Sequence, residues 1–263
     1  MARSSLKNVM RLVNIEKEKL SPEQSFLEDL KRSIELTDMK NSQLPSKTFK
    51  PSSMNCIRAS YYQIMGKPID NTGSSYVSVG ICNSGSDIHE RIQQAVSEMI
   101  LNNMDCEYVD VGDYLKKHKI KDVEIKSKIG FETKLYSPKY NISFMCDGII
   151  KYKNHYYILE FKTETSNKFF MRKEVDISHY KQGTAYSLLL RINEVIFVYI
   201  SRDTLDMKSF MFTPTDEMKQ DLIAYIDECT EYVNLQTSPP KPLNVEKKTC
   251  QYCNYKTQCR NDG

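Results

Sequence analysis

Hydrophobic and polar residues alternate with a helical period near the start of the chain. Ser21-Pro-Glu-Gln24 has the form of a capping box, in which side chains satisfy the free N–H groups at a helix start, and Pro22 suits the first helical position. Apolar residues then recur at roughly helical spacing, at Phe26, Leu27, Leu30, Ile34 and Leu36. We predict a helix here and a linker over residues 41–51, so that residues 1–50 form a helical extension.

Two further helices are predicted before the middle of the chain. One covers about residues 54–65 and ends at Gly66, because glycine commonly terminates helices. The other begins near residues 84–87, since apolar residues then recur every four positions and place one stripe inward, at Ile88, Ile92, Val96 and Ile100.

The pattern changes to short β-rich runs over residues 123–162, which are rich in Ile, Tyr and Phe. A helix is predicted over about 176–191, strands over 194–201 and 207–213, and a helix over about 214–234. The order is helix, mixed β, helix, β, β, helix. It predicts an α/β fold with a mixed central sheet flanked by helices.

Composition and charge narrow the class of protein. The 263 residues are 40% hydrophobic and 27% charged, which is ordinary for a globular protein. An apolar run over residues 195–200 is far shorter than the roughly 20 residues of a membrane helix. The start of the chain has no secretory apolar block, so we expect a cytoplasmic protein without a membrane partner. The net charge of +3 neither requires nor excludes a nucleic-acid partner.

Two neighbouring strands carry the candidate chemistry. If Lys153 and Asn154 form a two-residue hairpin turn, Asp147 lies directly opposite Glu160 on the same face of the sheet. Like charges in this position destabilise a sheet unless a positive charge lies between them. A turn one residue later would instead place Asp147 opposite Lys162, as a plain cross-strand ion pair.

A divalent cation suits the gap between the two carboxylates, because carboxylate oxygens are preferred ligands of Mg²⁺ and Mn²⁺. Lys162 projects to the same side and could orient a water molecule or stabilise charge on a phosphate. The alternative is a solvated charged face. Glu160 and Lys162 lie in Ile-Leu-Glu-Phe-Lys, which otherwise reads as a buried strand, and charges there need partners.

Asp147 followed by Glu160-Phe-Lys162 resembles the Asp…Glu-x-Lys core of the PD-(D/E)XK nuclease superfamily, with Cys146 in place of the nominal proline. Three features resemble its RecB-like branch. His89 is similar to an upstream motif histidine, and Gln182-Gly-Thr-Ala-Tyr186 is similar to the Gln-x-x-x-Tyr element. The third feature is a set of four cysteines, Cys56, Cys250, Cys253 and Cys259, which looks like the iron–sulfur staple of the AddB nuclease domain and of stand-alone CRISPR-adaptation exonucleases.

The resemblance implies a restriction-endonuclease-like core over residues 51–263 and a metal-dependent deoxyribonuclease activity. The Mg²⁺ or Mn²⁺ ligands that it implies are His89, Asp147, Glu160 and the carbonyl of Phe161. It further implies that Lys162 positions the attacking water and that Gln182 and Tyr186 orient the DNA strand. Single-stranded or free-ended DNA is the implied substrate, with exonuclease action favoured over endonuclease action.

The implied cellular setting is recombination, repair, or the processing of phage or CRISPR DNA. The chain has no Gly-x-x-x-x-Gly-Lys-Ser/Thr loop, so any helicase, recombinase or single-strand-binding partner would be a separate protein. The sequence leaves the oligomeric state open.

The three cysteines at the end of the chain have Cys-x₂-Cys-x₅-Cys spacing, which predicts ligation. Four thiolates can hold a 4Fe–4S cluster or a zinc ion, and the sequence leaves both possibilities open. In either case the group would act as a clasp that ties the C-terminus to the helix next to Cys56.

Residues just after the second strand alternate cations with aromatic rings and are candidates for DNA binding, at Lys168, Phe169, Arg172 and Lys173. The alternative is a loop with a hydrophobic plug. His179 shares a helix face with Gln182 and Tyr186 and is a candidate for the lining of the cleft.

The competing class of function is a catalytically inactive subunit that binds DNA or protein. An iron–sulfur cluster or zinc would then have only a structural role.

Overall fold

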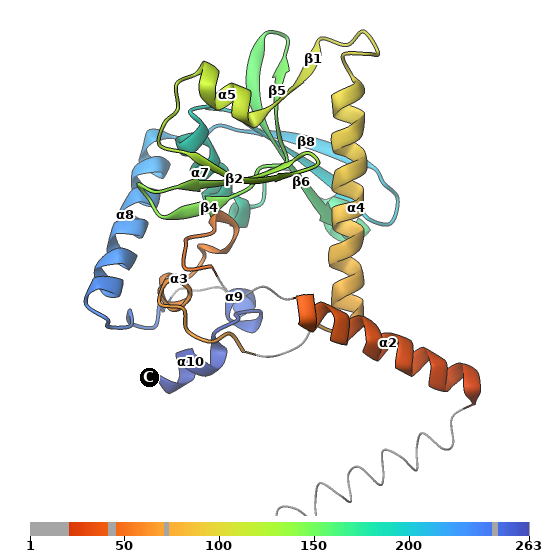
Figure 1. Cartoon of the computed structure of the whole chain (residues 1–263), viewed down its shortest axis with the longest axis vertical. Helices are drawn as coiled ribbons and strands as arrows, with labels where there is room; N and C mark the ends of the chain where they lie inside the picture. The colour runs from red at the N-terminus through yellow and green to blue at the C-terminus, as the bar shows by residue number, and fades with distance from the viewer. Residues whose placement is uncertain (1–20, 42–45, 71–73, 244–246, 263) are drawn as a thin grey trace, which may run out of the picture. The chain divides into compact units, whose positions relative to one another are not determined.

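The computed structural model describes residues 21–41, 46–70, 74–243 and 247–262, and these form two compact units (Figure 1). Within the described ranges, the first unit comprises residues 21–41 and 74–83. The second comprises 46–70, 84–243 and 247–262, and it contains both β-sheets. No helix in these ranges is both long and apolar enough to cross a lipid bilayer.

A five-stranded sheet forms the centre of the second unit. Its strand order is β1-β5-β6-β7-β8, and the strands are β1 (Cys106–Val109), β5 (Gly148–Tyr152), β6 (His155–Glu164), β7 (Val195–Ser201) and β8 (Met207–Phe212). Strands β6 and β7 run parallel, and every other neighbouring pair is antiparallel. The predicted α/β fold with a mixed central sheet is confirmed.

The β5–β6 hairpin has the predicted register. Tyr152 pairs with His155 and Gly148 pairs with Leu159, so Lys153 and Asn154 form the turn. Both turn residues have positive φ, 47° and 68°, as a type I′ turn requires. This turn matches the right-handed twist of the strands and fixes which residues of β6 lie on each face.

One face of this sheet packs against α4 (Tyr76–Glu98), whose residues from 84 onward belong to the second unit (Figure 1). Leu159 and Phe161 of β6 lie in a small buried cluster on this face. The inward stripe of α4 packs against that cluster at Ile88, Ile92 and Val96, as the sequence predicted. The fourth predicted position, Ile100, is wrong, because α4 ends at Glu98 and Ile100 is exposed.

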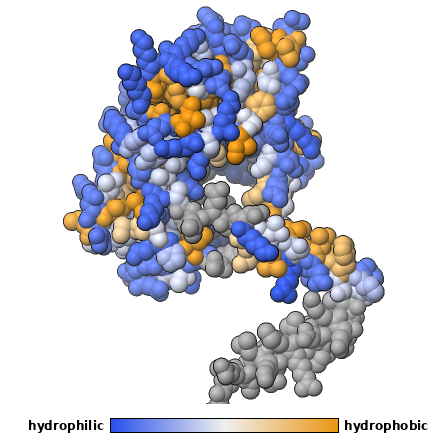
Figure 2. All heavy atoms as spheres, viewed as in Figure 1, coloured by the Kyte–Doolittle hydropathy of each residue, from blue (hydrophilic) through white to orange (hydrophobic). Residues whose placement is uncertain are grey.

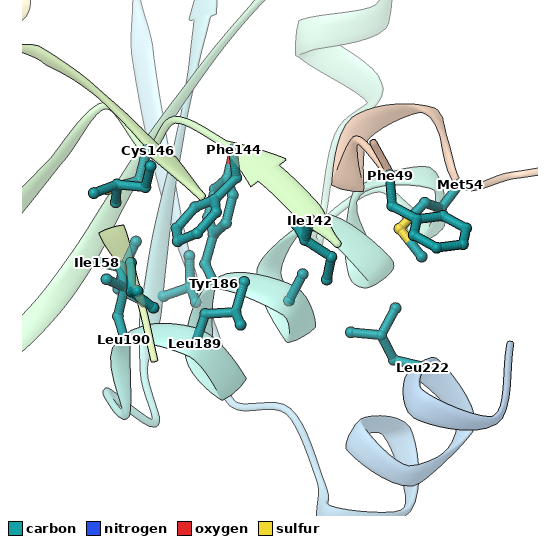
Figure 3. Packing of buried hydrophobic residues seen from close by; sticks show 14 of the residues in the cluster. Phe49, Met54, Ile142, Phe144, Cys146, Ile158, Tyr186, Leu189, Leu190 and Leu222 are labelled. Carbon is teal, nitrogen blue, oxygen red and sulfur yellow. The ribbon is translucent and has the colours of Figure 1, made fainter. Parts of the chain in front are cut away.

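The opposite face carries the larger core, shown in Figure 3. This core contains Ile158 of β6 and buried residues of three helices: α3 (Ile57–Ile64), α7 (Tyr180–Leu190) and α8 (Asp216–Asn234). Leu189 of α7 and Met54, which precedes α3, are almost completely buried there. Alternate residues of β6 therefore face two different helical layers, as the strand period demands.

A second sheet with the order β2-β3-β4 is made of β2 (Glu124–Ile129), β3 (Glu132–Ser137) and β4 (Ile142–Phe144). Phe49 forms a parallel bridge to Ile142 at its edge. The β-rich region predicted over residues 123–162 is therefore divided between two sheets, and the chain passes from β4 to β5 through residues 145–147.

The C-terminal helices α9 (Lys247–Gln251) and α10 (Lys256–Asn261) return to the segment around α3. Tyr62 donates a hydrogen bond to Asp262 over 2.9 Å, and the rings of Tyr62 and Tyr255 are 5.8 Å apart. The backbone N–H of Asp70 also donates to the carbonyl of Asn254 over 2.7 Å. The described C-terminal segment thus lies beside α3, and the predicted clasp by bound metal stays a prediction.

The first unit contains α2 (Pro22–Asn41) and residues 76–83 of α4. Half of the predicted capping box is present: the N–H of Ser21 donates to Oε1 of Gln24 over 3.1 Å, whereas Oγ of Ser21 has no hydrogen-bond partner in the described residues. The N–H of Tyr76 donates to Oε1 of Glu35 over 3.0 Å. Apolar side chains remain exposed along α2 (Figure 2), at Phe26, Leu27, Leu30, Leu36 and Met39.

Two helical boundaries differ from the prediction, and several short elements were missed. α4 begins at Tyr76, well before residue 84, because Ser75 caps it by accepting from the N–H of Ser78. The helix predicted over 54–65 is shorter, because η1 (Pro51–Ser53) and a turn precede α3. The short elements that the sequence missed are β1, α5 (Val111–Lys117), α6 (Ser166–Met171), α9 and α10.

A core substitution tests the packing of α7 on the sheet. Leu189 is only 1% exposed, so Leu189→Ala should lower the free energy of unfolding by about 2–5 kcal/mol through lost burial and the cavity left behind. Leu101→Ala, at a 77% exposed position, should change it by less than about 0.5 kcal/mol. Denaturant unfolding of the two variants measures both values, and equal losses would contradict this packing.

Candidate active site

Asp147 lies in a bend immediately before β5, at the point where β6 continues beyond the end of its partner strand. The backbone N–H of Phe161 therefore has no strand partner on this side and donates to Oδ2 of Asp147 over 2.6 Å. The N–H and C=O of a strand residue point to the same edge, so the Phe161 carbonyl faces the same gap. The end of β5 thus places a carboxylate and a main-chain carbonyl together.

Glu160 and Lys162 project from β6 on the α7 side and contact each other. The Nζ atom of Lys162 lies 2.7 Å from Oε1 of Glu160 and donates to Oε1 of Gln182 over 2.9 Å. Among the described residues these two oxygens are its only hydrogen-bond partners, and an ammonium group has three donors. The remaining N–H is available to a water molecule or a phosphate oxygen.

The electrostatics of Glu160 favour a bound cation. Burial and then repulsion from Asp147 raise the pKa of Glu160, while Lys162 and Gln182 act in the opposite direction. Its Oε2 atom is buried and has no hydrogen-bond partner in the described part of the chain. A buried carboxylate oxygen without a donor is unfavourable, so this atom fits a metal ligand.

Gln182 and Tyr186 lie one turn apart on α7 and extend this network. The Nε2 atom of Gln182 donates to Oε1 of Glu160 and to the hydroxyl of Tyr186, over 2.7 Å each. The Tyr186 hydroxyl donates in turn to the carbonyl of Met145. Burial raises the pKa of Tyr186 well above its ordinary value, so the hydroxyl keeps its proton. α7 thereby holds both Glu160 and the segment that leads to Asp147.

His89 approaches Asp147 from α4, on the other side of the sheet. Its Nδ1 lies 3.5 Å from Oδ1 of Asp147, and its ring packs edge-on against Phe161 at 5.8 Å between centroids. Among the described residues, no three His, Cys, Asp or Glu side chains have the geometry of a formed metal site, here as elsewhere. The predicted donor set that borders the gap is two carboxylates, an imidazole and the Phe161 carbonyl. Such a set suits Mg²⁺ or Mn²⁺.

The sequence analysis missed two side chains that contact Asp147. Gln93 on α4 and Tyr108 on β1 both donate to its backbone carbonyl, over 2.7 and 3.1 Å. Gln93 lies one helical turn after His89, a spacing that could have identified it. Tyr108 had no such signal, because β1 has only four residues.

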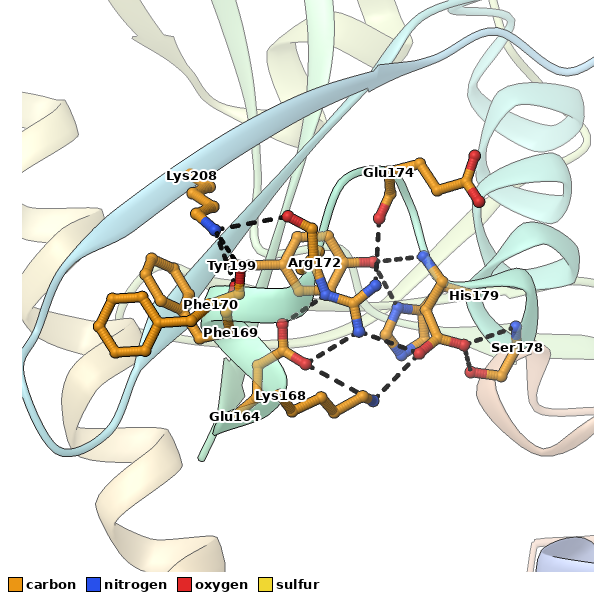
Figure 4. Close-up of polar contacts among 11 residues, drawn as sticks. Glu164, Lys168, Phe169, Phe170, Arg172, Glu174, Ser178, His179, Tyr199 and Lys208 are labelled. Atoms are coloured by element: carbon orange, nitrogen blue, oxygen red, sulfur yellow. Dashed lines mark hydrogen bonds and ion pairs between the residues drawn. The ribbon is translucent and has the colours of Figure 1, made fainter. Parts of the chain in front are cut away.

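A buried ion-pair network continues from the same face of β6 (Figure 4). Glu164 accepts from Nε and Nη2 of Arg172, and Nη2 also lies 3.0 Å from Oδ2 of Asp176. The side chains of Glu164 and Arg172 are only 5% and 6% exposed. Burial tends to raise the pKa of Asp176, but hydrogen bonds from Ser178, Lys168 and Arg172 outweigh it and hold that pKa well below its usual value.

His179 and Tyr199 connect this network to Lys162. Tyr199 lies beside Lys162 in the β6–β7 register, and its hydroxyl accepts the N–H of Asp176 over 3.0 Å. That hydroxyl also lies 2.8 Å from Nδ1 of His179 (Figure 4). Burial and then the charge of Lys162 lower the pKa of His179 to about 3, so its ring is neutral at neutral pH.

The candidate DNA-binding residues have different environments. Phe169 is buried beneath Lys208, whose Nζ lies 4.6 Å from the ring centroid, and Arg172 is held by Glu164 and Asp176. Lys168 is half exposed and pairs with Asp176 over 3.0 Å, whereas Lys173 is exposed. The residues lie on and just after α6, so the segment is a short helix. Their contact with DNA remains a prediction.

The four cysteines predicted to act as ligands lie near one another. Burial is the main factor that raises the pKa of Cys253, and the nearby thiols of Cys56, Cys259 and Cys250 add to it. Cys56 is the N-cap residue of α3, which brings it to the C-terminal segment. No group of three or more His, Cys, Asp or Glu side chains in the described ranges has the geometry of a formed metal site. The ligand set therefore remains a prediction.

The chain matches no family model and no curated protein. Among solved structures, SSO0001 is similar at 17% identity with a TM-score of 0.45, over 90% of this chain and 97% of that protein. The alkaline exonuclease LHK-Exo from Laribacter hongkongensis is similar at 9% identity with a TM-score of 0.39, over 73% of this chain and 90% of the exonuclease. Its complex with dAMP gives a TM-score of 0.40 over the same shares. At these values neither likeness identifies the activity of this chain.

Removing the guanidinium from the buried network should destabilise the second unit. Arg172→Met leaves Glu164 and Asp176 without their main buried partner, so the free energy of unfolding should fall by about 3–5 kcal/mol. Adding Glu164→Gln should recover part of the loss, because it removes one of the unpaired charges. Denaturant unfolding of Arg172→Met and of the double variant measures both free energies of unfolding. A loss below about 1 kcal/mol for Arg172→Met would show that the ion pairs behave as exposed ones.

Proposed function

We propose that this protein is a metal-dependent deoxyribonuclease. The observation that carries the proposal is the meeting of Asp147 and Glu160 beside the ammonium group of Lys162, with Oε2 of Glu160 buried and without a donor among the described residues. Two carboxylates that share a buried gap need a cation, and a lysine beside them suits chemistry on a phosphate. The sequence resemblance to PD-(D/E)XK nucleases rests on these same residues.

The proposed ligands of Mg²⁺ or Mn²⁺ are Asp147, Glu160, the Phe161 carbonyl and His89. When bound, the ion would lower the pKa of a coordinated water and neutralise charge on the phosphate. Oδ2 of Asp147 accepts a hydrogen bond from the Phe161 N–H, and Oδ1 lies next to His89. Oε1 of Glu160 accepts hydrogen bonds from Lys162 and Gln182, so Oε2 is the oxygen that would bind the ion.

Lys162 is proposed to orient the attacking water and to stabilise negative charge on the phosphate through its third N–H. Gln182 holds this ammonium group in place, because its amide accepts from Lys162 and donates both hydrogens, to Glu160 and to Tyr186. All polar atoms of the amide are thereby used and its orientation is fixed. Tyr186 in turn anchors the segment before Asp147.

The proposed substrate is DNA that is single-stranded or has a free end, with exonuclease action favoured. This finer assignment comes from the sequence resemblance, as does the expectation of a separate helicase, recombinase or single-strand-binding partner. The competing function, a catalytically inactive DNA- or protein-binding subunit, is disfavoured by the intact Asp147, Glu160 and Lys162 contacts. Burying charged groups together is unfavourable and is typical of functional sites, so it is not expected in a subunit without activity.

Removal of the proposed site should abolish DNA hydrolysis. With Mn²⁺ and end-labelled single-stranded DNA, Lys162→Ala and Asp147→Asn should each lower the rate by at least about a hundredfold, because the water loses its orienting group or the ion loses a ligand. Gel analysis of the labelled products measures the rate and distinguishes nucleotide release from internal cuts.

Lys116→Ala, at an 82% exposed lysine on α5 outside the site, is the matched control and should retain hydrolysis. Thermal unfolding of all three variants shows that they fold. Hydrolysis that survives both Lys162→Ala and Asp147→Asn would refute the assigned site. A wild-type protein without hydrolysis in Mn²⁺ or Mg²⁺ would favour the inactive-subunit alternative.

We further propose that Cys56, Cys250, Cys253 and Cys259 hold a 4Fe–4S cluster, with zinc as the alternative occupant. The support is their spacing and their mutual proximity around Cys253. Such a group would close a loop across nearly the whole second unit and add to the hydrogen bonds between α3 and the C-terminal segment.

Metal analysis separates the two occupants. Anaerobically purified protein should be brown and contain iron and inorganic sulfide in similar amounts, and Cys253→Ser should lose both because one thiolate ligand is missing. Cys82→Ser, at an exposed cysteine outside the set, is the control and should retain them. Colourless protein that contains zinc would overturn the cluster, and protein with neither metal would overturn the ligand set.

A further inference from the structure

The backbone carbonyl of Asp147 is held by side chains. Asp147 precedes the first ladder pair of β5 and β6, which is Gly148 with Leu159. Its carbonyl accepts from Nε2 of Gln93 over 2.7 Å and from the hydroxyl of Tyr108 over 3.1 Å. Two separate elements, α4 and β1, therefore reach the main chain of one proposed ligand.

Gln93 is an unusual residue for its position. It is only 3% exposed, and the neighbouring inward positions of α4 are apolar, at Ile92 and Val96. A buried amide is costly unless it is hydrogen-bonded, and an apolar side chain would suit this layer. The partner that satisfies its Nε2 is Asp147. His89, one turn earlier on the same helix face, lies next to the carboxylate of that residue.

Tyr108 reaches the same carbonyl through a space that only a glycine leaves open. A Cβ on Gly148 would lie 2.7 Å from Cε2 of Tyr108, which is closer than real contacts allow. The Tyr108 hydroxyl is also 3.3 Å from the carbonyl of Phe131, at the tip of the β2–β3 hairpin. One hydroxyl has one proton, so it serves one of the two carbonyls at a time, whereas Gln93 has no competing acceptor in the described residues.

We propose that Gln93 and Tyr108 are positioning residues that hold the Asp147 carbonyl and thereby set the direction of its carboxylate toward Glu160 and the ion. This inference rests on the proposed function, because it assigns Asp147 as a ligand. Second-layer contacts of this kind orient metal ligands and tune metal affinity. Because two donors share one acceptor, either donor alone keeps the carbonyl bonded, and the two are partly redundant.

The test measures Mn²⁺ binding directly, by electron paramagnetic resonance, in full-length protein without DNA. Gln93→Leu should weaken Mn²⁺ binding by about tenfold, within the roughly 10–100-fold range for residues that orient metal ligands. Gln94→Leu is the matched control and should bind Mn²⁺ like the wild type, because Gln94 is exposed and its amide donates to Glu98. Tyr108→Phe is the second single variant, and it removes only the hydroxyl that donates to the Asp147 carbonyl.

Redundancy predicts the result for the double variant. Gln93→Leu with Tyr108→Phe should weaken Mn²⁺ binding by more than the product of the two single effects, because only this combination leaves the carbonyl without a donor. Steady-state hydrolysis should need correspondingly more Mn²⁺, with the KM for DNA unchanged. Thermal unfolding reports whether each variant keeps its fold, and a merely structural role would shift the midpoint without changing Mn²⁺ affinity.

The outcomes distinguish this inference from the nuclease proposal. Equal Mn²⁺ affinity in the wild type and a folded double variant would overturn the positioning role, whatever the activity. Weakened binding in a protein that hydrolyses no DNA would support the positioning role and refute the nuclease. A wild type that binds no Mn²⁺ would overturn both, because Asp147 would then not be a ligand.

Discussion

The candidate site depends on one constraint, which is that two carboxylates, Asp147 and Glu160, occupy a shared buried gap. Burial, and then repulsion from Asp147, raise the pKa of Glu160, so the surrounding groups must supply positive charge or hydrogen-bond donors. Asp147 receives a backbone N–H, and one oxygen of Glu160 receives Lys162 and Gln182. The second oxygen of Glu160 receives none in the described part of the chain. The arrangement is satisfied except at the place where a cation would bind.

Strands of unequal length make this arrangement possible. Because β6 extends past the end of β5, the Phe161 N–H is free to bind a carboxylate, and the layers on both faces of the sheet reach the same point. His89 comes from the α4 layer and Gln182 from the α7 layer. Farther along β6, Glu164 anchors the segment that leads into α7 through Arg172 and Asp176. The charged residues of one strand face therefore organise the helices packed on it.

The sequence predicted the long elements and the centre of the site because both have strong periodic signals. The sequence left two registers open for the β5–β6 hairpin, and the turn at Lys153 and Asn154 selects the one that places Asp147 opposite Glu160. Elements of four to seven residues, such as β1 and α5, have too few positions for a periodic pattern. Tyr108 could not be found for this reason. The burial of Arg172 could not be predicted either, because its partners, Glu164 and Asp176, become neighbours only in the folded chain.

The turn at Lys153 and Asn154 gives the protein a vulnerable point at its surface. Exposed loops ordinarily tolerate an added or deleted residue, because few contacts depend on their length. Here one residue more or less would shift β5 by one position against β6 and turn its alternate side chains to the opposite layer. Asp147 would no longer meet the Phe161 N–H. Length variation at this turn should therefore be as damaging as the loss of Asp147 itself, although Lys153 and Asn154 lie at the other end of β5.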